Sequence, residues 1–140
     1  MIEDGKAMQA RCVCGGVTVD LPGPSFEVFA CHCIECQRRT GAPFGVGAYY
    51  PAEKVLMVGA TTEFARPTDA GGTFRSYFGP TCGTSVLWET TGMPGMIGVA
   101  VGAIDGFDHP RPTRSLWERS RQPWATLGGE MEHSPRGLHY

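Results

Sequence analysis

The sequence lacks the features of membrane and nucleic-acid-binding proteins. No apolar run in its 140 residues approaches the roughly 20 needed to span a bilayer. Residues 1–10 contain no apolar stretch, so we expect no signal peptide and a cytoplasmic protein. Basic residues are not in excess, since 12 Lys and Arg stand against 14 Asp and Glu, a formal net charge of −2. Nucleic-acid-binding domains usually carry a basic footprint. We therefore expect neither a nucleic-acid nor a membrane partner.

Long stretches without glycine or proline are also missing. The 20 glycines and 11 prolines recur every few residues, which excludes long helices. Short segments between them alternate at the period of a strand. Strands are predicted over residues 17–21, 26–33, 45–50, 62–65, 73–78, 84–89, 96–101 and 115–119, with helical turns over 34–40 and 51–56. The predicted fold class is mainly β, with one domain over residues 9–127, a flexible tail over 1–8 and a loose tail over 128–140. A domain of this size can bury a core without disulfides.

The sequence does contain six cysteines, and five of them form two short clusters. The clusters are Cys12-Val13-Cys14 and Cys31-His32-Cys33-Ile34-Glu35-Cys36, and the sixth cysteine is Cys82. In an extended segment residues i and i+2 share a face, so each C-x-C pair can approach one metal ion. In a reducing compartment these spacings favour metal binding over disulfides. Zinc is the expected metal; an iron–sulfur cluster or buried free thiols are the alternatives.

The two clusters predict different kinds of zinc site. The cluster at 31–36 supplies three ligands from one segment and leaves one tetrahedral position open, as in catalytic zinc sites. Cys12 and Cys14 need a distant partner, and Cys82 is the cysteine that remains. A link between distant segments is typical of a structural zinc. We therefore expect one or two Zn²⁺ ions per chain.

Four segments carry a resemblance to a known family. They are Cys12-Val13-Cys14-Gly15-Gly16-Val17, residues 31–41, Phe78-Gly79-Pro80-Thr81-Cys82-Gly83-Thr84 and, more weakly, residues 117–124. In these motifs the chain resembles the glutathione-dependent formaldehyde-activating enzyme family, which includes centromere-protein-V-like proteins. The resemblance implies a single-domain Mss4-like fold of short antiparallel sheets organised around zinc–thiolate sites. It assigns Cys31, Cys33 and Cys36 to a catalytic zinc, and Cys12, Cys14 and Cys82 to a structural zinc.

The implied reaction is that of a carbon–sulfur lyase running in reverse. It joins glutathione and formaldehyde to give S-(hydroxymethyl)glutathione. Three thiolates give a bound zinc ion a net charge of about −1, which suits it to holding a substrate thiol as a thiolate. A related lyase would use another thiol or carbonyl substrate. The sequence is also compatible with a non-catalytic zinc-binding interaction module, with a thiol redox or metal-storage protein, and with a homo-oligomer.

The chain departs from the family at Gly79, where relatives usually have a cysteine. The implied structural set therefore has three thiolates. Its fourth ligand would be water, a carboxylate or a histidine such as His109 or His133, or else the site would be weak or empty. We expect lowered zinc affinity there.

Substrate-binding residues are expected directly after the second cluster. Arg38 and Arg39 are candidates because a guanidinium fork suits carboxylates, and glutathione has two. Solvated arginines would give the same pattern. Gln37 is a candidate for orienting the substrate or for capping a turn. The aromatic residues, including Tyr49 and Trp88, are expected mostly in the core.

Overall fold

A computed structural model describes residues 7–106, 109 and 111–138 of the chain. In chain order the elements are β1 (Met8–Arg11), β2 (Thr18–Leu21), β3 (Val28–Cys31), α1 (Ile34–Thr40), β4 (Gly45–Pro51), the 3-10 helix η1 (Ala52–Lys54), β5 (Leu56–Val58), β6 (Thr62–Pro67), β7 (Thr73–Phe78), β8 (Ser85–Thr90), β9 (Met96–Ala100), η2 (Val101–Ala103), β10 (Arg114–Leu116), η3 (Glu118–Ser120) and β11 (Glu132–His133). The predicted class, mainly β, is confirmed. Among the described residues, no helix is long and apolar enough to cross a membrane.

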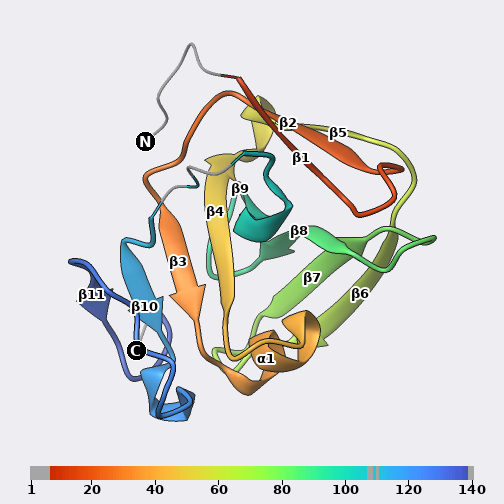
Figure 1. Ribbon diagram of the computed structural model, residues 1–140. Coiled ribbons are helices and arrows are strands. Elements are labelled where there is room, and N and C mark those ends of the chain that lie inside the picture. Colours follow the sequence, from red (N-terminus) through yellow and green to blue (C-terminus); the bar gives the residue numbers. More distant parts are fainter. Residues whose placement is uncertain (1–6, 107–108, 110, 139–140) are drawn as a thin grey trace.

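The strands of the described chain form two sheets (Figure 1). A three-stranded sheet has the order β1-β2-β5, and an eight-stranded sheet has the order β11-β10-β3-β4-β9-β8-β7-β6. Neighbouring strands are antiparallel except that β10 runs parallel to both β3 and β11. A long connection precedes β10, and such a connection lets a strand enter a sheet in the same direction as its neighbour.

Alternation along β4 gives the large sheet two different faces. Ala48 and Tyr50 are fully buried against the three-stranded sheet, in a core shared with side chains of β1 and β2. Gly47 and Tyr49, between them in sequence, line a cavity on the opposite face. Successive residues of a strand point to opposite sides. One strand therefore serves both the core and the cavity.

The short helix α1 has clear boundary signals. Cys33 is its N-cap, and the Cys33 sulfur accepts a hydrogen bond from the backbone N–H of Cys36. Gly41 ends the helix in the left-handed conformation, at φ 66°, which glycine adopts without steric cost. The helix thereby follows directly on the end of β3.

The chain after β9 returns to the edge of the large sheet. The strand predicted over 115–119 ends at Leu116, because Trp117 adopts a left-handed conformation with φ 58°. The segment expected as a loose tail contains β11, and its Ser134 carbonyl accepts from the backbone N–H of Glu118. Of the tail expected over 1–8, residues 1–6 lie outside the described residues, and β1 begins at Met8.

Candidate functional site

The fold brings the six cysteines together in two groups of three. The hairpin cluster consists of Cys12, Cys14 and Cys82, and the pocket cluster consists of Cys31, Cys33 and Cys36. In each group the three Sγ atoms lie within 4.8 Å of one another. Thiolates bound to one zinc ion stand about 2.3 Å from it, so both groups are compact enough to share an ion. All six cysteines are free of disulfides.

The hairpin cluster joins the two sheets. Cys12 and Cys14 lie in the turn between β1 and β2, and Cys82 lies in the turn between β7 and β8. Backbone N–H groups of the first turn donate to Cys12 Sγ at 3.2 Å and to Cys14 Sγ at 3.4 Å. The backbone of this turn thus offers one N–H donor to each of two sulfurs of the hairpin cluster.

Thr84 connects the two turns of the hairpin cluster. Its hydroxyl accepts from the backbone N–H of Val13 at 3.0 Å and lies 3.2 Å from Cys82 Sγ. The pKa of Cys82 is lowered to about 6, first by the Thr84 hydroxyl, which donates to the sulfur, and then by backbone N–H groups. The sequence analysis did not single out Thr84. Its position two residues after a cysteine is the signal that could have revealed it.

Gly79 borders the position that three sulfurs leave open. A Cβ atom built on this buried glycine would lie 3.1 Å from Cys82 Sγ and 3.4 Å from Cys12 Sγ. Among the described residues, no fourth cysteine, histidine or carboxylate joins the hairpin cluster. His109 Nε2 is instead 2.7 Å from the Ile104 carbonyl. His133 Nδ1 is 2.6 Å from a carboxylate oxygen of Glu118.

The pocket cluster is built from one segment, where β3 passes into α1. Cys31 ends β3, Cys33 caps the helix, and Cys36 lies in its first turn with 6% of its surface exposed. The pKa of Cys36 is lowered to about 3, first by hydrogen bonds from the Cys31 and Cys33 thiols and then by the charge of Arg39. Hydrogen bonds with the Cys33 and Cys36 thiols, and then burial, raise the pKa of Cys31. A soft, partly ionised donor set of this kind fits Zn²⁺.

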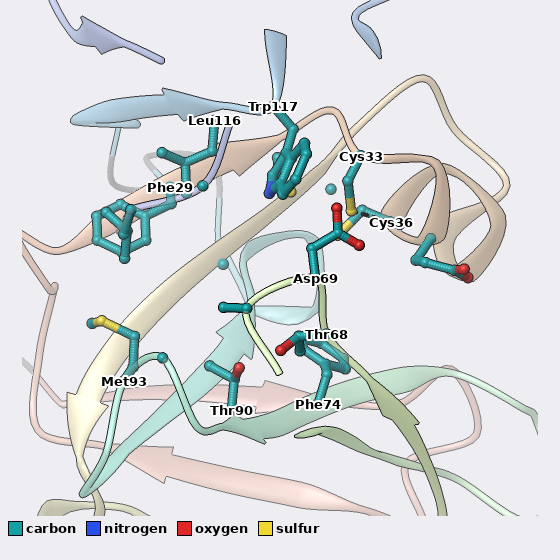
Figure 2. Close-up of a pocket in the computed structure, with 18 of the residues that line it drawn as sticks. Phe29, Cys33, Cys36, Thr68, Asp69, Phe74, Thr90, Met93, Leu116 and Trp117 are labelled. Carbon is teal, nitrogen blue, oxygen red and sulfur yellow. Dashed lines mark hydrogen bonds between the residues drawn. The ribbon is translucent and has the colours of Figure 1, made fainter. Parts of the chain in front are cut away.

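A cavity of about 830 Å³ opens beside the pocket cluster (Figure 2). Its walls come from β3, β4, β7, β8, α1 and the segments around residues 66–72 and 116–120. The larger apolar side chains in the wall include Phe29, Tyr49, Phe74, Trp88, Leu116 and Trp117, and the charged ones are Glu35, Arg39, Arg66, Asp69 and Arg119. None of the hairpin-cluster cysteines is among the described residues that line it.

Glycines make room for the aromatic wall. The indole of Trp88, on β8, lies over Gly47 and Gly98, where a Cβ atom on either glycine would overlap the ring. The guanidinium of Arg39 stands over this indole, 4.4 Å from the ring centroid. Arg39 itself occupies space next to Gly45, where a Cβ atom would lie 2.7 Å from Arg39 Nη2. The close packing holds both the indole and the guanidinium in place.

Two more arginines of the cavity stack on aromatic rings. Arg66 stands over Phe74 at 4.6 Å, and Arg119 stands over Trp117 at 5.5 Å. Stacking leaves the edges of a guanidinium available for hydrogen bonds to a carboxylate. The sequence analysis did not single out Arg66 or Arg119 as binding residues. Arg66 belongs to none of the motifs, and Arg119 lies in the weakest of them, residues 117–124, far in sequence from Cys31, Cys33 and Cys36.

The predicted substrate-binding residues lie on different sides of α1. Arg39 lines the cavity, whereas the exposed Arg38 lies beside a shallow second hollow. The Gln37 amide donates to the carbonyls of His32 and Ser120, at 2.9 and 3.1 Å, and ties the helix to the segment after β10. Of these three predicted residues, only Arg39 is among the described residues that line the cavity.

Comparisons with known proteins show which family the chain belongs to. The family model described as glutathione-dependent formaldehyde-activating enzyme matches residues 7–120. The crystal structure of a Rhodobacter sphaeroides protein is similar with a TM-score of 0.58 and 24% identity, over 72% of this chain and 91% of that one, which shows a shared fold. A comparison with curated proteins finds no match. Because the family model spans most of the chain and both cysteine clusters, the chain belongs to the glutathione-dependent formaldehyde-activating enzyme family.

Proposed function

We propose that the protein is a zinc-dependent carbon–sulfur lyase-type enzyme that forms and cleaves the adduct of glutathione and formaldehyde, S-(hydroxymethyl)glutathione. The observation that carries the proposal is the position of the pocket cluster. Its three sulfurs come from one segment and lie in the wall of a cavity large enough for a tripeptide adduct. An open zinc position beside such a cavity is the arrangement of a catalytic site.

Cys31, Cys33 and Cys36 would hold the zinc ion. When bound there, zinc would supply a position at which a substrate thiol is kept as a thiolate. The residues around it bind and orient the substrate and exclude water. Holding a thiol and an aldehyde next to each other makes their reaction effectively unimolecular, which is a large source of acceleration.

The charges in the cavity support glutathione as the thiol. Glutathione carries two carboxylates and one ammonium group. The cavity offers three arginines and two carboxylates, and the charge of Arg39 lowers the pKa of Cys36. We infer that Arg39, Arg66 and Arg119 bind the carboxylates, and that Glu35 and Asp69 face the ammonium group. The apolar wall strengthens these interactions by lowering the local dielectric constant.

The free state of all six cysteines supports a reducing, cytoplasmic location, where glutathione-based systems keep thiols reduced. The burial and the clustering of the cysteines disfavour a role in disulfide exchange, which needs accessible thiols. Five of the six sulfurs are at least partly buried, and all six lie within metal-binding distance of two others.

Exchange NMR tests the proposed reaction directly. Zinc-loaded protein is mixed with glutathione and ¹³C-formaldehyde, and magnetisation transfer between hydrated formaldehyde and the adduct is measured against buffer alone. We expect exchange well above the uncatalysed rate, and its loss when zinc is removed with a chelator. Full zinc content with no acceleration would instead identify a non-catalytic zinc-binding module.

A further inference from the structure

Tyr49 places a hydroxyl group in the cavity wall that the proposed function does not use. The residue lies on β4 and its side chain lines the cavity. The indole N–H of Trp88 donates to its hydroxyl oxygen at 2.9 Å. In the described part of the chain no acceptor takes the Tyr49 O–H in return. The phenol therefore has a proton to donate, and the cavity is where it can find an acceptor.

The position of this hydroxyl is closely fixed. The Tyr49 ring packs on Phe29, with centroids 5.2 Å apart, and stands edge-on to the Trp88 indole at 6.3 Å. Trp88 is itself held over Gly47 and under Arg39. A donor fixed in this way needs no reorganisation when negative charge develops near it, which is the condition for strong transition-state stabilisation.

The surroundings also keep the phenol protonated. Burial raises the pKa of Tyr49 to about 12, and the nearby thiols of Cys36 and Cys31 act in the same direction. Tyr49 and the three cysteines of the pocket cluster line the same cavity. At neutral pH the group is thus a neutral hydrogen-bond donor in the wall of the cavity that would hold the substrate.

We propose that Tyr49 is a catalytic residue that donates its phenolic proton to the aldehyde oxygen as the carbon–sulfur bond forms. This inference rests on the proposed function. The thiol first loses its proton to water, and an electron pair of the thiolate sulfur forms the bond to the carbonyl carbon. The π electrons of the carbonyl move to oxygen, which takes the proton of Tyr49. The phenolate, stabilised by the Trp88 N–H, then regains a proton from water. In the reverse direction the phenolate takes the hydroxyl proton of the adduct as the carbon–sulfur bond breaks.

Two matched variants test the role of Tyr49. Tyr49→Phe removes the hydroxyl and keeps the ring. Tyr50→Phe makes the same change one residue along, in the core, where the hydroxyl donates to the Gly23 carbonyl at 2.8 Å. We expect Tyr49→Phe to lower kcat for adduct formation about 100-fold, with unchanged zinc content and a nearly unchanged KM for glutathione. Tyr50→Phe should lower the melting temperature and leave kcat as it is.

Tyr49→Phe also leaves the Trp88 N–H without its acceptor, so a second measurement is needed. Site-specific replacement of Tyr49 by 3-fluorotyrosine retains that acceptor and makes the phenol more acidic. We expect the alkaline limb of the kcat profile, corrected for the uncatalysed rate, to move to lower pH. If the wild-type protein does not accelerate adduct formation, both the proposed function and this role of Tyr49 are overturned. An active wild type with an equally active Tyr49→Phe variant, or an alkaline limb that does not move, overturns the role of Tyr49 alone.

Discussion

The hairpin cluster and the pocket cluster each consist of three cysteine sulfurs, yet their surroundings differ. Each has three sulfurs within 4.8 Å of one another. The hairpin cluster lies between two turns, where Cys14 is exposed and backbone N–H groups meet the sulfurs. The pocket cluster lies beside an aromatic cavity with a stacked arginine at its edge. A ligand set thus indicates a metal, while its surroundings indicate what the metal is for.

The two clusters also differ in what they hold together. The hairpin cluster joins residues about 70 positions apart and connects the three-stranded sheet to the eight-stranded one. Its loss would free two turns that belong to different sheets. The pocket cluster spans only Cys31 to Cys36, so it closes no long loop. We therefore propose that the first cluster contributes mainly to stability and the second mainly to chemistry.

The largest expected effect comes from removing one cysteine of each cluster. Cys36→Ser should lower the rate of adduct exchange at least about 100-fold, because it removes one of the three proposed zinc ligands in the cavity. Cys14→Ser should retain most of the activity and lower the melting temperature. Exchange NMR, zinc content per chain and thermal unfolding measure the three quantities. Equal loss of activity in both variants would contradict the division of roles.

A smaller effect should separate two neighbouring arginines. Arg39→Gln should raise the KM for glutathione about tenfold, since a charge-assisted hydrogen bond in the cavity is lost. Arg38→Gln, on the exposed side of α1, is the matched control and should leave KM within twofold, roughly the error of such comparisons. Steady-state kinetics at a fixed formaldehyde concentration would measure the KM for glutathione of both variants. A larger change for Arg38→Gln would mean that the substrate uses the opposite side of the helix.

Restoring the missing cysteine at position 79 should make the hairpin cluster retain zinc for longer. The Cβ of Gly79→Cys would begin near the open corner of the hairpin cluster, and the backbone there is not left-handed. We expect zinc to leave this cluster about tenfold more slowly under chelator challenge, as four ligands close the site. Gly79→Ala adds the same Cβ without a thiol. Equal zinc loss from both variants would show that the fourth corner does not limit retention.

The smallest expected effect concerns the hydroxyl that links the two turns of the hairpin cluster. Thr84→Val leaves the Val13 N–H and the Cys82 sulfur without their partner. We expect a loss of about 1–2 kcal/mol in the free energy of unfolding, measured with denaturant. Thr81→Val, at an exposed position of the same turn, should change it by less than about 0.5 kcal/mol. An unchanged stability in Thr84→Val would show that water replaces the hydroxyl.

Much of the fold could be predicted because its signals are local. The helix over 34–40 is preceded by a capping cysteine and followed by Gly41, and most strands lie between glycines and prolines. The parallel entry of β10 and the pairing of β11 had no such signal. Both depend on where a long connection returns to the sheet, which local alternation does not encode.

The substrate side of the site was harder to predict than its metal side. Adjacent residues of a helix differ by about 100° around its axis, so Arg38 and Arg39 face different directions. Which of them meets the cavity depends on how α1 packs against β4. The alternation of Tyr49 and Tyr50 likewise places them on opposite faces but does not say which face is the core.

The sequence by itself determined the grouping of the cysteines at 31–36, the pairing of Cys12 with Cys14, and the mainly β fold. These features depend on spacings of a few residues, over which backbone geometry dictates the direction of side chains. Only the tertiary structure decided that Arg66 and Arg119 share a cavity with Arg39, and that Tyr49 points into it from a strand whose neighbour Tyr50 is buried in the core. A cavity wall is assembled from strands distant in sequence, and sheet pairing, rather than local spacing, brings their side chains together.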